Sequence, residues 1–145
     1  MQTATQLDRV AAEALRHASG PALYDVWKLE RALWLGEGDA RDRHVRLDAV
    51  CVMPEPYGIL RGSEELGRLH RMSPYSDVSF EERAFSRARN TVVVAYRAEA
   101  IHRTTFEPYS ALCSSTYAWE AGRLQLMLHQ HTSLAEVSRR DAPRR

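Results

Sequence analysis

Apolar residues follow two different periods in this 145-residue chain, one helical and one strand-like. Across residues 7–18 and 23–34 they recur every three or four positions, which is typical of amphipathic helices that bury one face. Residues 91–101, 109–119 and 124–130 are instead rich in Val, Thr and Tyr and are separated by short turns, as expected for strands joined in hairpins. The pattern therefore predicts helices combined with a mostly antiparallel sheet.

Turn and capping residues limit the other elements. Gly20-Pro21 ends the first helix, and Asp39 is expected to cap a short third helix that reaches His44. We expect a strand over 47–53, a turn over 54–58 and a brief return strand at 59–60. A helix then begins at Ser63 and ends at Ser73-Pro74. A long polar strand over 77–89 is expected to place Val78, Phe80, Ala84 and Ala88 on one face.

The predicted order is helices, a short strand pair, a helix, and then four long strands. This order is typical of an α+β fold in which helices pack on one side of a strongly curved, mostly antiparallel sheet. The arrangement is a cone whose concave face forms a natural ligand cavity. We expect one domain over residues 1–134, with an extra N-terminal helix, and a charged, disordered tail over 135–145.

Composition excludes several classes of protein. A net charge of +1 gives no electrostatic footprint for nucleic acid or for an acidic membrane. Residues 1–8 lack the features of a signal peptide, so a cytoplasmic location is expected. Cys51 and Cys113 lie in strand-like apolar runs without CxxC spacing, and we interpret them as buried free thiols.

Several segments between residues 23 and 134 carry a resemblance to a known superfamily. They are Ala32-Leu33-Trp34-Leu35-Gly36, Val52-Met53-Pro54 with Gly58-Ile59-Leu60, Ala95-Tyr96-Arg97-Ala98, the run from Pro108 to Tyr117, and His129-Gln130-His131-Thr132. The chain resembles the nuclear transport factor 2-like superfamily with the cystatin-like cone fold, and within it a mostly uncharacterised bacterial branch. This superfamily includes SnoaL-type cyclases, ketosteroid isomerase and scytalone dehydratase. The resemblance implies the cone fold, whereas one fold supports unrelated activities.

Aromatic residues suggest where a ligand binds. Trp27 and Trp34 share one helix face. They either form an aromatic wall for a flat apolar ligand or pack in the core between the helix and the sheet. Three tyrosines, Tyr96, Tyr109 and Tyr117, lie on the predicted strands. Their phenols either converge on a cavity or pack across strands with their hydroxyls at the rim. We expect a cavity between this helix and the concave sheet, with ligand-binding residues among Trp27, Trp34, Met53, Tyr57, Tyr96, Tyr109 and Tyr117.

His129 is the candidate for catalysis, because its charge changes near neutral pH. A general base of this kind needs an orienting group, and the acids that the patterns can turn inward are Glu30, Asp39 and Asp48. The histidines lack acidic or cysteine ligands at diagnostic spacing, so neither a metal nor a cofactor is expected.

Two functions remain open. The first is a small-molecule binding protein for an apolar or aromatic ligand, with or without lyase- or isomerase-type activity. The alternative is a non-catalytic structural or protein-interaction homodimer formed through the outer sheet face. The last strand carries Leu124, Leu126 and Leu128 on one face and Met127 on the other. Apolar residues on both faces of a sheet are explained if a second subunit packs on the outer face. Arg97 and Glu99 share the side of the strand opposite Tyr96. Arg97 either binds a carboxylate with two guanidinium nitrogens or forms a surface or dimer-interface ion pair with Glu99.

Overall fold

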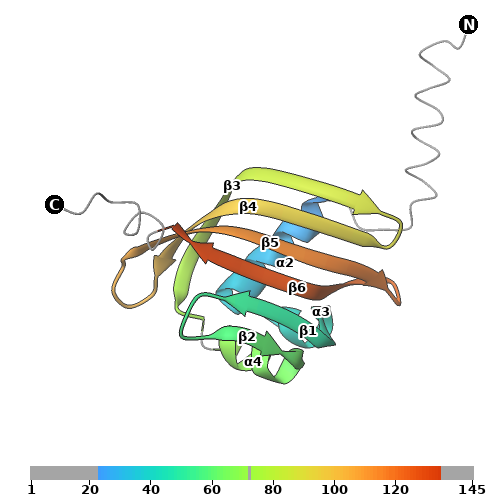
Figure 1. Ribbon diagram of the computed structural model, residues 1–145, viewed down its shortest axis with the longest axis horizontal. Coiled ribbons are helices and arrows are strands. Elements are labelled where there is room, and N and C mark those ends of the chain that lie inside the picture. Colours follow the sequence, from blue (N-terminus) through green and yellow to red (C-terminus); the bar gives the residue numbers. More distant parts are fainter. Residues whose placement is uncertain (1–22, 72, 135–145) are drawn as a thin grey trace, which may run out of the picture.

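The computed structural model describes residues 23–71 and 73–134, in which helices and strands follow the order that the sequence predicts. The helices are α2 (Leu23–Leu35), α3 (Ala40–His44) and α4 (Gly62–Arg71). The strands are β1 (Val45–Met53), β2 (Gly58–Arg61), β3 (Tyr75–Ala88), β4 (Thr91–His102), β5 (Pro108–Glu120) and β6 (Arg123–Ser133) (Figure 1). The helix expected over 7–18 and the tail expected over 135–145 lie outside the described residues.

The strands form one six-stranded sheet in the order β2-β1-β6-β5-β4-β3. All neighbouring pairs are antiparallel except β1 and β6, which run parallel. The prediction of a mostly antiparallel sheet is thus confirmed. The pairing also places His129 of β6 between Cys51 of β1 and Ser115 of β5.

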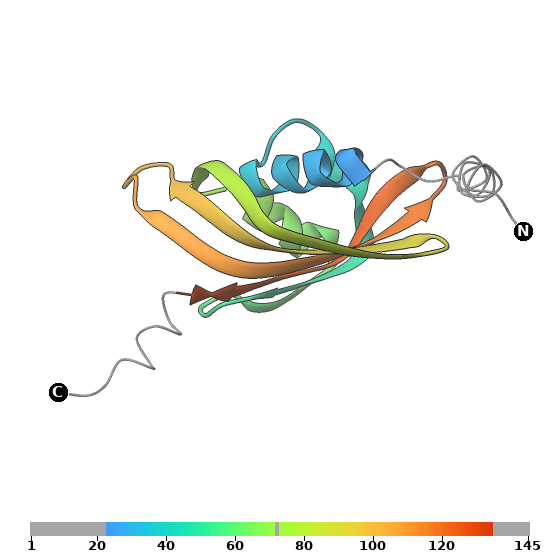
Figure 2. The ribbon, with the colours of Figure 1, turned by 90° about the horizontal axis from the view of Figure 1, so that it is seen from above.

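The helices lie on one side of the sheet. Figure 2 shows the sheet curving around α2, with α4 on the same concave side. Helix α2 buries Val26, Leu33 and Trp34 against this side, each no more than 7% exposed. The α+β arrangement predicted from the sequence is therefore confirmed, and it encloses space between the helices and the sheet.

Strand β3 departs from the predicted pattern. Val78 and Phe80 are buried, but Ala84 is exposed. The pairing with β4 shifts register between Glu81 and Ala84, where Glu82 adopts a positive φ of 50°. This bulge ends the strict alternation of sides, so the prediction of one continuous apolar face along β3 is wrong.

Two smaller predictions have opposite outcomes. The Asp39 side chain makes no capping hydrogen bond to α3, so that prediction is wrong; its carboxylate lies 3.6 Å from the Arg43 guanidinium instead. Cys51 and Cys113 are both free and buried, as predicted. Among the described residues, no helix is long and apolar enough to cross a lipid bilayer.

Candidate functional site

A cavity of about 680 Å³ lies where α2 and α4 face the concave side of the sheet. This volume is in the range of small-molecule binding sites. Most of the lining is apolar, and Tyr57 and Ile59, each 56% exposed, are its most open apolar groups. The lining residues are Glu30, Leu33, Trp34, Met53, Tyr57, Ile59, Leu60, Glu65, Arg68, Leu69, Ser73, Pro74, Tyr75, Leu126, His129 and His131.

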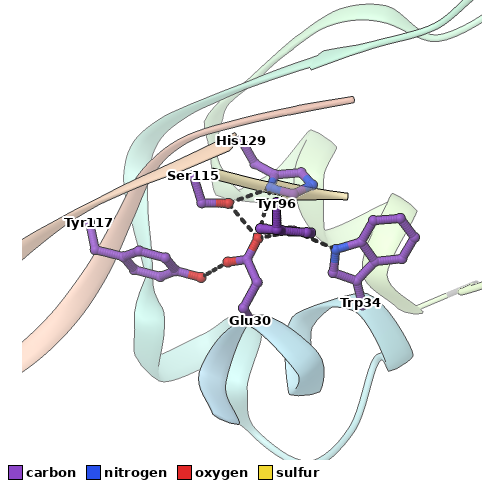
Figure 3. Close-up of polar contacts among 6 residues, drawn as sticks. All are labelled: Glu30, Trp34, Tyr96, Ser115, Tyr117 and His129. Carbon is purple, nitrogen blue, oxygen red and sulfur yellow. Dashed lines mark hydrogen bonds and ion pairs between the residues drawn. The ribbon is translucent and has the colours of Figure 1, made fainter. Parts of the chain in front are cut away.

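A buried carboxylate lies at the wall of this cavity. Glu30 belongs to the inward stripe of α2 and is only 1% exposed. Figure 3 shows the side chains that converge on it from the sheet. Tyr96 and Ser115 donate hydrogen bonds to its Oε1 atom and Tyr117 donates to Oε2, while His129 Nδ1 lies 3.2 Å from Oε1.

These donors keep Glu30 ionised. Burial is the largest single influence and raises its pKa, but the hydrogen bonds and charge of its neighbours outweigh burial, with His129 contributing most, followed by Ser115 and Tyr117. The net result is a Glu30 pKa below its ordinary value. Burial, and then the negative charge of Glu30, raise the pKa values of Tyr96 and Tyr117 well above the ordinary value. Both phenols therefore remain protonated donors.

The same network determines which nitrogen of His129 carries the proton. Ser115 Oγ lies 2.5 Å from Glu30 Oε1 and 2.5 Å from His129 Nδ1. An ionised carboxylate only accepts hydrogen bonds, so the Ser115 hydroxyl donates to it. The serine oxygen then accepts from Nδ1–H. In the neutral imidazole this leaves Nε2 without a proton, as a hydrogen-bond acceptor.

Nε2 is directed away from the buried network. Figure 3 shows it on the side of the imidazole ring opposite Ser115 and Glu30. His129 is 9% exposed and lines the cavity, and its hydrogen bonds to other described residues are made through Nδ1. Ser115, by contrast, is fully buried and held by both partners, so the three residues do not form a serine-nucleophile site.

Trp34 belongs to both the cavity wall and the network. Its indole N–H donates to the Tyr96 hydroxyl at 2.8 Å. Its ring also stacks on His131, with centroids 4.3 Å apart and planes 12° apart. Trp34 therefore fixes the Tyr96 hydroxyl that faces Glu30 while its ring forms part of the cavity lining.

The structure brings together some of the expected site residues. Trp34, Met53, Tyr57 and His129 line the cavity. The other expected residues, Trp27, Tyr96, Tyr109 and Tyr117, lie outside its lining.

The excluded aromatic residues have packing or hydrogen-bonding roles. Trp27 packs against Phe80 and Tyr96, with centroid distances of 5.8 and 5.6 Å. Tyr109 stacks on Tyr75 at 5.4 Å. Tyr96 and Tyr117 contact Glu30 from behind the cavity surface.

Of the three acids that the sequence offered as orienting groups, only Glu30 is buried. The side chains of Asp39 and Asp48 are 70% and 74% exposed. Helix α4 also contributes Glu65 and Arg68 to the cavity lining, and the sequence did not predict either residue there. No local signal indicates them, because both lie on the polar side of a short helix.

Comparisons with known proteins reveal a likeness in structure but not in sequence. No family model and no curated protein matches the chain. A structure of a candidate ketosteroid isomerase from Parabacteroides distasonis is similar with a TM-score of 0.65 and 12% identity, over 77% of this chain and 87% of that one. A nuclear transport factor 2-like protein from Cytophaga hutchinsonii has a TM-score of 0.64 and 12% identity, over 79% and 100%.

A candidate SnoaL-like polyketide cyclase from a Jannaschia species is similar with a TM-score of 0.54 and 13% identity, over 82% of this chain and 90% of that one. At such identities the likeness establishes the fold alone. The fold is the nuclear transport factor 2-like, SnoaL-like cone, which confirms the fold that the sequence resemblance implied.

Proposed function

We propose that the chain binds a small, largely apolar molecule in the cavity and that His129 acts on it as a general base. The observation that carries the proposal is that His129 lines the cavity while its Nδ1 atom is held beside the buried Glu30 carboxylate. Nδ1 is held by Ser115 and by Glu30, at 2.5 and 3.2 Å, and the ring lines the cavity with its other nitrogen on the side away from these two partners (Figure 3).

The chemistry follows from the charges. When Nε2 takes a proton from the ligand, the imidazole becomes a cation beside the Glu30 carboxylate, which stabilises it. In an isomerase-type reaction the proton returns at another atom of the ligand. In a lyase-type reaction the electron pair left on the ligand expels a leaving group. Glu30 is a positioning residue in both cases, because its oxygens face the network and not the ligand.

The fold supports this proposal as an analogy. Two of the similar structures are those of a candidate ketosteroid isomerase and a candidate polyketide cyclase, so the fold is compatible with a small-molecule reaction in its cavity.

Binding is tested with N-phenylnaphthylamine, a neutral apolar dye that fluoresces in apolar sites. The protein is expected to enhance its emission saturably. Met53→Trp fills part of the cavity and should weaken binding, whereas Met127→Trp adds the same bulk on a strand position outside the lining and should not. Equal binding by both variants, or none by the unmodified protein, would contradict the proposal.

Base chemistry is tested by NMR in D₂O with β-tetralone, an apolar ketone whose C–H protons next to the carbonyl are acidic. The protein should accelerate their exchange for deuterium, and His129→Gln should reduce that acceleration about 100-fold or more. Exchange that is unaffected by His129→Gln would remove the general base from the account.

A second function, association into a homodimer, has its own supporting observation. On the outer face Val93, Thr116 and Leu128 lie side by side across β4, β5 and β6. The prediction that Leu128 shares the face of Leu126 is wrong, because the β5–β6 register shifts between Thr116 and Tyr117. The next row consists of Ala95, Ser114, Gln130 and Val52. These two rows carry no charged side chain, which suits burial against a second copy of the sheet.

A further inference from the structure

We propose that the ligand is a flat ring compound with an enolic or phenolic hydroxyl, and that this O–H donates a hydrogen bond to Nε2 of His129. The inference rests on the proposed function and specifies its substrate class. It starts from the direction of the hydrogen bonds around the buried carboxylate.

Glu30 is already engaged by the protein. Three hydroxyl groups donate to it, His129 Nδ1 lies 3.2 Å from Oε1, and the residue is only 1% exposed, so its oxygens have little surface to offer a ligand. With its Nδ1 proton held on the buried side, the neutral His129 ring presents Nε2 to the cavity as an acceptor only. A ligand that approaches this wall must therefore bring a donor, because an acceptor would leave Nε2 unpaired.

The other polar groups of the cavity are less selective. The hydroxyls of Tyr57 and Tyr75 both donate and accept, so they match either kind of ligand group. The Glu65 carboxylate accepts a hydrogen bond from the Arg61 amide at 2.6 Å. Arg68, which can only donate, lines the cavity from α4, whereas at the wall formed by β6 it is His129 that discriminates between a ligand hydroxyl and a ligand carbonyl.

The walls indicate the rest of the ligand. The Trp34 and His131 rings, stacked on each other, and the Tyr75 ring beside Trp34 line the cavity, and Leu33, Leu69 and Leu126 complete its apolar lining. Flat apolar rings pack well against such aromatic walls through offset or edge-to-face contacts. A hydroxyl on a ring is also more acidic than one on a saturated carbon, which suits proton transfer to an imidazole.

The corresponding reaction step needs no co-reactant. Nε2 removes the enol O–H proton, the oxygen electron pair forms the C=O bond, and the C=C pair takes the proton back from Nε2 at the ring carbon. The product is the ketone isomer, with atoms and electrons balanced and the histidine returned to its starting state.

The test compares β-naphthol with its matched ether, β-methoxynaphthalene, as displacers of the bound N-phenylnaphthylamine. The two molecules share a ring system, but only the naphthol has an O–H. We expect β-naphthol to bind about fivefold to tenfold more tightly. Equal or tighter binding of the ether overturns the hydroxyl inference and leaves the proposed cavity function standing. Binding of neither also overturns the hydroxyl inference, whereas the cavity function is decided separately by the binding of the dye itself.

Two variants test whether His129 causes the preference for naphthol over its ether. His129→Leu should remove this preference, whereas His102→Leu, which changes a histidine outside the cavity lining, should retain it. The comparison of the two molecules on the unmodified protein decides the matter even if His129→Leu fails to fold. Naphthoic acid tests the alternative of an anionic ligand bound by Arg68. If this acid binds more tightly than naphthol and Arg68→Ala removes the difference, the hydroxyl inference is overturned.

Discussion

Glu30 and His129 come from the first described helix and the last strand, and yet Nδ1 of the histidine lies 3.2 Å from Oε1 of the glutamate. The contact forms because α2 crosses the concave face while β6 lies near the middle of the sheet. Both residues are at most 9% exposed. A buried carboxylate and imidazole at a cavity wall are costly to maintain without full hydrogen bonding, which the three hydroxyl donors to Glu30 supply.

The first prediction concerns the charge of Glu30. Glu30→Gln places an amide among groups that all donate, so it loses at least one acceptor and leaves buried donors unpaired. We expect the free energy of unfolding to fall by about 3–5 kcal/mol, measured by urea denaturation. Glu64→Gln on α4, at a side chain that is 87% exposed, is the matched control and should change the free energy of unfolding by less than about 0.5 kcal/mol. A stable Glu30→Gln variant would refute the ionised network.

The second prediction is an acid dependence of stability. The folded-state pKa of Glu30 lies below its ordinary value of 4.5. Stability from this group is therefore fully present above about pH 4.5 and is lost as pH falls through the folded-state pKa. Urea midpoints measured from pH 6 downward should decline less steeply in Glu30→Gln than in the unmodified protein. Parallel declines would show that Glu30 does not titrate as described.

The third prediction concerns thiol reactivity. Burial, and then the negative charge of Glu30, raise the pKa of Cys51 to about 12 and also raise that of Cys113 above its ordinary value. Both thiols should react slowly with a bulky aromatic disulfide reagent near pH 8, and rapidly once urea unfolds the chain. Rapid labelling of both under native conditions would contradict their burial.

The raised thiol pKa also sets a limit at high pH. An unfolded cysteine ionises near pH 9, before the folded Cys51 does. Stability should therefore fall as pH rises above about 9, which the same urea midpoints can measure.

The fourth prediction is self-association through the outer sheet face. Light scattering at micromolar concentration should give twice the monomer mass of 16.5 kDa. Thr116→Arg places a charge in the uncharged central row and should produce monomers. Phe106→Arg, in the β4–β5 connection and 74% exposed, should leave the mass unchanged. A monomer for the unmodified chain would rule out this function.

Periodicity was sufficient to predict most of the fold and part of the site. Helical spacing placed Glu30 on the buried stripe with Trp34, and alternation placed His129 and His131 on one face of β6, where both are buried. These assignments need only local geometry.

The remainder depends on contacts between distant segments. The parallel pairing of β1 with β6 determines that Cys51 adjoins His129, and no turn in the sequence encodes that pairing. The bulge after Glu81 reverses the sides of β3 without a glycine or proline to mark it. Arg68 lines the cavity only because α4 packs beside β1 and β2.

The most direct measurement of the central claim is a long-range ¹H–¹⁵N NMR spectrum of the His129 ring, with the free protein and then with β-naphthol added. The account predicts a protonated Nδ1 and an unprotonated Nε2 in the neutral ring, with the Nε2 resonance moving toward the protonated position when naphthol binds. His129→Gln identifies the signals by their disappearance. A free-protein spectrum with the proton on Nε2, or an Nε2 resonance that naphthol leaves unchanged while bound, would contradict the account.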